Sequence, residues 1–150
     1  MAGKSGSFST AILTAFLGTQ VPAIVGTTYL ALLHTNPSDD YMTGAVETTY
    51  TNYARQSIVS TSTGWNTPGP GTGTTQSMTN KLLLTFPTAG ATGDTGINGA
   101  ALCQHLATAI TTANEVYYWG LISGAPKVIN GGSPGDPVSV AAGAWTQTEA

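Results

Sequence analysis

The chain has 150 residues, of which 41% are hydrophobic and only 7% are charged, and its formal net charge is −3. This size and hydrophobic content suit one domain with one core and exclude a disordered chain, which combines low hydrophobicity with high net charge. The four basic residues are scattered along the chain, so there is no basic patch, and we expect no nucleic-acid partner. They are Lys4, Arg55, Lys81 and Lys127.

Threonine and glycine take the place of the missing charge, with 26 and 19 copies respectively. Threonine is β-branched and fits a pleated, half-exposed surface, whereas glycine and proline supply turns. The composition therefore predicts a mainly β protein, an antiparallel β-sandwich or jelly-roll-like domain. So few charges give little repulsion between copies, which favours a component of an assembly over an isolated monomer.

The single cysteine, Cys103, excludes an internal disulfide and indicates that no oxidising compartment is needed. Residues 8–17 are interrupted by Ser and Thr, so they lack the continuous apolar stretch of a signal peptide. No run approaches the roughly 20 apolar residues of a membrane span. We therefore expect a protein made in the cytoplasm, without a membrane partner.

An apolar stripe at helical spacing begins near the N-terminus and predicts a short amphipathic helix of roughly three turns. Ser7 or Ser9 can cap its start and Gly18 can end it. The stripe packs either on its own domain or on a neighbouring subunit, so its members are candidate interface residues. They are Phe8, Ile12, Leu13, Phe16 and Leu17.

The rest of the chain reads as short strands separated by turn signals, in a single domain over residues 1–150. Residues 1–27 form the helix and a connector arm, and residues 28–150 form the β-sandwich. Two segments, 41–52 and 60–77, are expected to be exposed loops. Residues 97–110 fit a helix or a strand, and their place between two strands favours a strand. The other expected strands are 28–34, 53–59, 78–86, 115–122, 127–130, 138–140 and 144–148.

Few residues suggest chemistry. His34, His105 and Cys103 could share a metal ion only if the fold gathered them, and no recognised zinc spacing supports this. The neighbouring Asp39 and Asp40 could bind calcium, but they lie in a sequence typical of a solvated turn. No nucleophile motif and no phosphate-binding glycine loop is present. We therefore expect no catalytic residue, no metal, no cofactor and no enzyme activity.

Arg55 lies within a predicted strand, where a buried cation needs a partner. It is either an anchor between subunits, through an ion pair or hydrogen bonds, or an outward-facing strand residue. Tyr117, Tyr118 and Trp119 should alternate between the two faces of their strand, so that one face is core and the other is surface or interface. Arg55, Tyr117 and Trp119 therefore join the candidate interface residues.

The order of several sequence blocks resembles a widespread family of small virion proteins of tailed bacteriophages, labelled tail fibre, minor structural or head decoration proteins. The most specific blocks are Tyr-Leu-Ala-Leu-x-His-Thr-x-Pro at residues 29–37 and Tyr-Ala-Arg-Gln at residues 53–56. Residues 85–89 and 141–144 continue the likeness. It covers most of the chain and is weakest at 60–77 and 90–113. The resemblance implies a structural component of the virion.

Three functions remain open, the first being preferred. A capsid decoration or cement protein would bridge capsomers on the head surface, binding the major capsid protein and sister subunits, most simply as a homotrimer. A tail, baseplate or short tail-fibre component would contact a receptor on the host surface. A carbohydrate-binding module or hydrolase would need Trp65, Trp119 or Trp145 as an exposed platform beside carboxylates. For a virion protein, residues 1–20 are the expected anchor.

Overall fold

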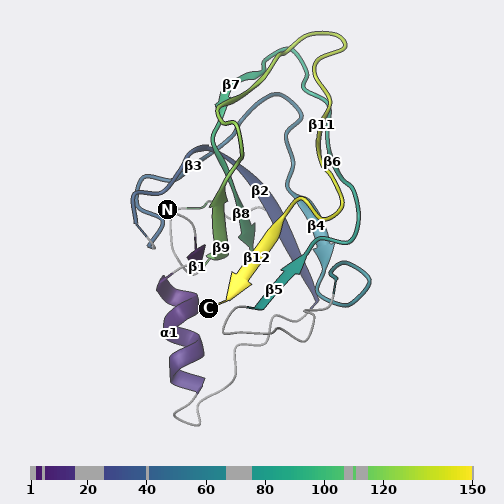
Figure 1. The fold of residues 1–150 in the computed structure, drawn as a ribbon. Helices are drawn as coiled ribbons and strands as arrows, with labels where there is room; N and C mark the ends of the chain where they lie inside the picture. The colour runs from purple at the N-terminus through teal and green to yellow at the C-terminus, as the bar shows by residue number, and fades with distance from the viewer. Residues whose placement is uncertain are drawn as a thin grey trace.

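The structure is a computed structural model that describes residues 3–4, 6–15, 26–39, 41–66, 76–106, 110 and 115–149. Within these residues the protein is mainly β, with antiparallel sheets and a short helix near the N-terminus, as the sequence predicts (Figure 1). The elements are β1 Gly3–Lys4, α1 Gly6–Ala15, β2 Thr27–Thr35, β3 Val46–Glu47, β4 Gln56–Val59, β5 Gln76–Thr79, β6 Leu84–Phe86, β7 Asp94–Ile97, β8 Gly99–Cys103, β9 Val116–Leu121, β10 Lys127–Ile129, β11 Val138–Val140 and β12 Thr146–Glu149.

The main sheet has the strand order β1-β9-β8-β2-β3, and β4 pairs with the same edge of β2 as β3 does. The central strand β2 pairs Tyr29–Leu33 with Cys103–Gly99 of β8. Residues 30–33 of β2 are all buried, so both faces of this strand are covered. The predicted strand 28–34 is therefore confirmed.

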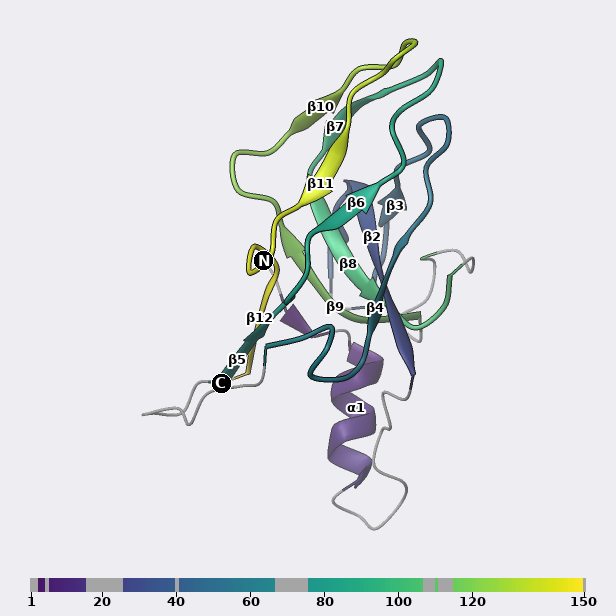
Figure 2. The same ribbon diagram turned by 90° about the vertical axis from the view of Figure 1, so that its right-hand side faces the viewer.

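Residues 76–103 and residues 116–149 form one long antiparallel hairpin. Its strand pairs follow one another along the chain: β8 with β9, β7 with β10, β6 with β11 and β5 with β12. The hairpin folds over at residues 87–93 and 130–137, where Ala89 N donates to Asp136 O and Gly132 N donates to Gly90 O. The folded half then lies over one face of the main sheet (Figures 1 and 2).

The fold has two hydrophobic clusters, one on each face of the main sheet. Alternation along β2 sends Leu30 and Leu32 into the first cluster and Ala31 and Leu33 into the second. The first cluster lies between the two layers, because it also contains side chains of β6 and, at its border, of β11. The second contains Met42, Cys103, Ile110, Val116 and Trp119.

Glycines permit the close crossing where the hairpin folds over. A Cβ on Gly93 would clash with the carbonyl oxygen of Ile129, and one on Gly135 would clash with that of Ala89. The backbones approach at these points more closely than any side chain allows. Two glycine-rich segments that look like ordinary turns in the sequence therefore meet in the structure.

The prediction of one strand over residues 78–86 is wrong. The structure has β5 and β6 instead, separated by a bend around Asn80, whose side chain is fully buried. Its Nδ2 donates to the carbonyl oxygens of Leu82 and Ala141, and its Oδ1 accepts from Trp145 N. A buried amide that bonds to three backbone groups interrupts the strand, although the neighbouring leucines favour an extended run.

Two predicted loops are also corrected. Residues 41–52 are an exposed loop only in part: most of them are exposed, but Met42, Thr48 and Tyr50 are buried and the segment contains the short strand β3. In the segment 60–77, Trp65 is buried and β5 begins at Gln76, while residues 67–75 lie outside the described part of the chain. The strand alternative for 97–110 is confirmed over β8, and residues 107–109 are likewise outside it.

Candidate functional site

The N-terminal arm packs on its own domain. Phe8 of α1 is 9% exposed, and its ring lies edge-on to Tyr117 and Tyr118 of β9, with centroids 5.1 and 5.4 Å away. The backbone of β1 adds to the edge of the main sheet, pairing Gly3 with Trp119. Phe8 therefore serves the fold of its own chain, and the described elements β1 and α1 both contact strand β9 of the β-domain.

The other described members of the apolar stripe on α1 are more exposed than Phe8. Ile12 is half-buried, whereas Leu13 is 66% exposed. Phe16 and Leu17 lie outside the described residues. Leu13 is therefore the described member of the stripe that is accessible to a partner.

The aromatic run on β9 is covered within the chain on both faces. Trp119 is 4% exposed and belongs to the second cluster, while Tyr117 and Tyr118 pack against the first. The register of β9 against β8 shifts between Leu102 and Cys103, which breaks the regular alternation at Tyr117. The face of β9 that is expected to be surface or interface contacts the chain's own helix through Tyr117 and Tyr118. Trp119 exposes little surface to a partner.

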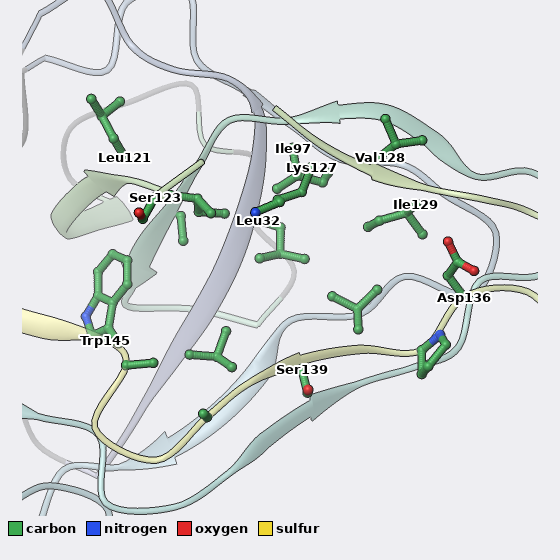
Figure 3. Close-up of a pocket in the computed structure, with 17 residues that line it drawn as sticks. Leu32, Ile97, Leu121, Ser123, Lys127, Val128, Ile129, Asp136, Ser139 and Trp145 are labelled. Atoms are coloured by element: carbon green, nitrogen blue, oxygen red, sulfur yellow. The ribbon is translucent and has the colours of Figure 1, made fainter. Parts of the chain in front are cut away.

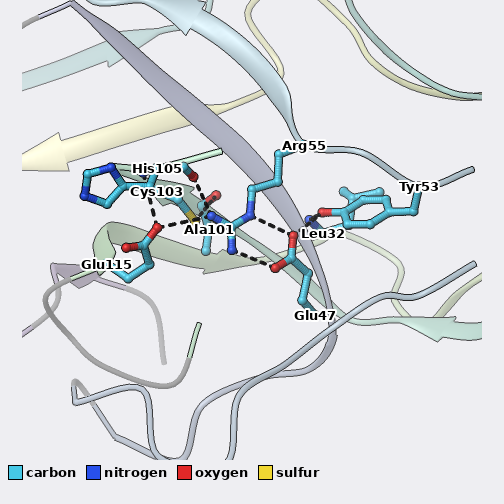
Figure 4. A network of polar contacts seen from close by, with 8 residues as sticks. All are labelled: Leu32, Glu47, Tyr53, Arg55, Ala101, Cys103, His105 and Glu115. Atoms are coloured by element: carbon cyan, nitrogen blue, oxygen red, sulfur yellow. Dashed lines mark hydrogen bonds and ion pairs between the residues drawn. The ribbon is translucent and has the colours of Figure 1, made fainter. Parts of the chain in front are cut away.

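Arg55 lies just before β4 and is 6% exposed, so the outward-facing alternative is wrong. Its Nη2 lies 2.8 Å from Oε2 of Glu47, and its Nε donates to Oε1 of the same carboxylate at 2.9 Å. Its Nη1 pairs with Oε1 of Glu115 at 3.2 Å and also donates to the carbonyl oxygen of His105 (Figure 4). The guanidinium thus ties β3 and the start of β4 to the connection between β8 and β9.

Tyr53 extends this network into the main sheet. Its hydroxyl donates to Oε1 of Glu47 at 2.6 Å and accepts the N–H of Leu32 at 3.0 Å. Leu32 lies where the neighbour of β2 changes from β4 to β3, so its N–H needs a partner from outside the strands. Burial, together with Glu47, raises the pKa of Tyr53, which stays protonated as a donor.

The charged side chains of this network form ion pairs with one another instead of facing solvent. Burial alone would lower the pKa of Arg55, but hydrogen bonds and charges, Glu47 foremost, raise it. Both carboxylate partners of Arg55 come from its own chain, which gives the guanidinium a structural role. Its role between subunits stays a prediction. Nothing in the sequence spacing indicates these partners, because they lie 8 and 60 residues away.

The predicted metal candidates do not form a common site in the part of the chain that the structure describes. Nδ1 of His34 lies 2.7 Å from Oδ1 of Asp94, which also binds Thr48 through Oδ2 at 2.6 Å. Burial raises the pKa of Cys103 to about 12. Asp39 accepts the backbone N–H groups of Tyr41 and Thr43, as in a turn, and Asp40 is not described. Within the described ranges, no three His, Cys, Asp or Glu side chains gather as metal ligands.

An apolar pocket of about 660 Å³ opens between the two layers of the sandwich, beside β10 and β11 (Figure 3). Leu32 and Ala100 of the main sheet and Ile97 of β7, all members of the first cluster, line it. In the described chain β10 pairs only with β7 and β11 only with β6, so the layers are not joined here by strand pairing. Other lining residues include Leu121, Lys127, Val128, Asp136, Val138 and Trp145.

Sequence reasoning missed this pocket, since it depends on the long hairpin folding over the sheet. The pocket also separates the three tryptophans that could have formed an exposed sugar-binding platform. Trp65 and Trp119 are buried, while Trp145 lines the pocket, as does Asp136. Most of the remaining lining is aliphatic, which suits an apolar group better than a sugar.

The comparison with protein families identifies the group to which this chain is related. The model of the family described as "Podophage GP4 fiber I protein gp80" matches residues 3–148. The chain belongs to this podophage fiber family. No curated protein matches it. Membership confirms the resemblance to virion proteins of tailed phages, so the protein is a structural component of a phage particle. None of the described helices has the length and hydropathy needed to cross a membrane.

Proposed function

We propose that this protein is a non-enzymatic subunit of a fibre on the phage particle. The observation that carries the proposal is the family match over residues 3–148, because the family is described by a fiber protein of a podophage. This choice reverses the order of preference that the sequence alone favours, in which capsid decoration comes first.

The arrangement of charged side chains supports a structural role. Arg55, Glu47 and Glu115 satisfy one another in the interior, and Asp94 is held by His34 and Thr48. A catalytic acid or base needs a reactive group presented to a substrate, and these carboxylates are instead occupied by bonds within the chain.

The surface supports contacts with neighbouring proteins. Large apolar side chains are exposed on several elements although the chain carries few charges to keep it soluble. Each exposed side chain becomes favourable once a neighbour covers it. They include Leu13 66%, Leu82 57%, Leu83 60%, Leu121 57% and Val128 58%.

Capsid decoration is the second candidate. The chain is small, and its sequence has no heptad, collagen-like or β-helical repeat from which a fibre shaft could be built. A decoration protein would bind the major capsid protein in many copies on the head. A fibre subunit without a shaft repeat would instead act as a terminal, joining or adaptor domain, with a host receptor as a further partner.

Gold-labelled antibodies raised against the purified protein test the location on intact particles by electron microscopy. The fibre proposal predicts label on the tail or on projecting fibres. Label distributed over the head surface would contradict it and support decoration. Particles that lack the protein serve as the control for nonspecific labelling.

Leu13 is the proposed anchor to a partner in the particle. Deleting residues 1–20 would also remove β1 and Phe8, so a single change is the sharper test. We expect Leu13→Ser to reduce incorporation into particles while the purified protein keeps its fold by circular dichroism. The control, Val59→Ser, changes another exposed aliphatic residue, on β4. Normal incorporation of the Leu13 variant would refute this role.

A further inference from the structure

The chain contains two asparagines that are each followed by glycine, in the pairs Asn98-Gly99 and Asn130-Gly131. Asparagine is a chemically labile residue. It loses its side-chain amide most readily before glycine, because glycine has no Cβ to hinder attack by its backbone nitrogen. The two pairs have the same local sequence, so their surroundings in the fold decide which of them reacts.

The first pair is protected by the main sheet. Asn98 is half-buried, and Gly99 is buried as the first residue of β8, between β2 and β9. The Nδ2 of Asn98 donates to the carbonyl oxygens of His34 and Gly96. Attack of the Gly99 nitrogen on this amide therefore requires the centre of the main sheet to open.

The second pair lies on the surface, in the turn that follows β10. Asn130 and Gly131 are both exposed. The Nδ2 of Asn130 donates to Oδ2 of Asp136 at 2.9 Å. Among the described residues, none accepts the backbone N–H of Gly131. Release of the bond to Asp136 frees this amide without unpairing a strand.

We propose that Asn130 is a site of spontaneous deamidation, whereas Asn98 is spared. The backbone nitrogen of Gly131 bonds to Cγ of Asn130, and the Nδ2 group leaves as ammonia together with the proton of that nitrogen. Water then opens the resulting succinimide ring. Cleavage of the bond between Cγ and the Gly131 nitrogen gives aspartate, and cleavage of the bond between the main-chain carbonyl carbon and that nitrogen gives isoaspartate.

Both products disturb the place where the long hairpin folds over. In the unmodified turn, N and Nδ2 of Asn130 donate to Oδ2 of Asp136, and Asp136 N donates to Asn130 O. Aspartate at position 130 replaces the Nδ2 donor with a second carboxylate, so that two like charges meet. Isoaspartate lengthens the backbone by one carbon beside Gly131, where a Cβ would lie 2.6 Å from the carbonyl oxygen of Ala91. Deamidation therefore loosens the fold-over, whatever the place of the protein in the particle.

Peptide mapping by mass spectrometry measures deamidation in the full chain during storage at neutral pH. Deamidated Asn130 should accumulate in the folded protein, and Asn98 should react at least about tenfold more slowly, because the sheet must open first. In the same chain unfolded in guanidinium chloride, the two pairs should react at similar rates. The inference is overturned by a folded protein in which Asn130 stays intact or Asn98 reacts as fast, and by an unfolded chain that keeps the difference.

Asn130→Asp reproduces one product and tests its effect on the fold. Its melting temperature should fall by roughly 2–4 °C relative to wild type. Asn66→Asp adds the same charge at an exposed asparagine outside this turn and should change it less. Combining Asn130→Asp with Asp136→Asn again places an amide opposite a carboxylate and should recover most of the loss. A single variant as stable as wild type, or a double variant no more stable than the single one, would show that deamidation does not loosen the fold-over.

Discussion

At the scale of single residues, the buried ion pairs decide how the main sheet is completed. The sequence indicates that Arg55 needs a partner if it is covered, but it cannot identify Glu47 and Glu115. These carboxylates come from β3 and from the residue before β9, and only the fold brings them together. The same holds for Tyr53, whose hydroxyl replaces a strand partner for Leu32.

Replacing Arg55 by Met should destabilise the protein by about 3–5 kcal/mol, because it leaves the buried Glu115 without its cation. Urea denaturation followed by tryptophan fluorescence measures the change. Lys81→Met, at an exposed cation, is the control and should change stability by less than about 0.5 kcal/mol. Equal stabilities of the two variants would mean that the Arg55 network does not support the fold.

Asp94 should make stability depend on acid pH. Burial raises the pKa of its carboxyl, but hydrogen bonds from Thr48 and Gly96 and the contact with His34 outweigh this and lower the pKa. The ionised form is therefore favoured in the folded state. Its stabilising contribution is present above the unfolded pKa of 3.8 and is lost as the pH falls through the lower folded value.

The measurement is the melting temperature of wild type and Asp94→Asn as a function of pH. Wild type should be the more stable near neutral pH, and the difference should shrink as the pH falls below about 4. A difference that stays constant down to acid pH would show that ionised Asp94 gives no net stabilisation.

At the scale of elements, the strands that run through the core could be predicted and the interruptions could not. The sequence predicts β2 from its apolar run and β9 from its aromatic run. The run over residues 78–86 misled because Leu82 and Leu83 favour an extended strand, whereas the buried amide of Asn80 bends the chain. Side-chain bonds of this kind connect residues as far apart as 80 and 145.

Asn80→Ala should cost roughly 3 kcal/mol, because it removes the partners of three backbone groups around a buried site. Chemical denaturation measures the loss, and faster hydrogen exchange of the Trp145 amide should accompany it. Asn66→Ala is the matched control, since Asn66 is exposed and, among the described residues, its side chain donates to Thr79 alone. A loss no larger than the control's would remove Asn80 as the cause of the bend.

Substitutions along the apolar stripe of α1 should differ in how much they lower the stability of the protein. Phe8→Ala removes a ring packed on Tyr117 and Tyr118 and should destabilise the protein by about 3 kcal/mol. Leu13→Ala, at a largely exposed position on the same helix, should cost less than about 0.5 kcal/mol. Thermal denaturation compares them, and equal losses would contradict the packing of α1 described above.

At the scale of the whole molecule, the fold is a sheet covered by the returning half of its own long hairpin. Composition was sufficient for a mainly β, antiparallel fold, and the spacing of the apolar residues was sufficient for a short N-terminal helix. It was not sufficient for the fold-over, which depends on the close contacts of Gly93 and Gly135 with distant backbone. The pocket depends on that fold-over, so it could not be predicted from the sequence either.

Membership of the podophage fiber family makes the protein a virion component, and its position in the particle is the central claim to test. The most direct measurement is the copy number per virion, by quantitative mass spectrometry against the major capsid protein. The fibre proposal predicts a small number of copies that matches the symmetry of the tail. Hundreds of copies in a simple ratio to the capsid protein would contradict it and place the protein on the head.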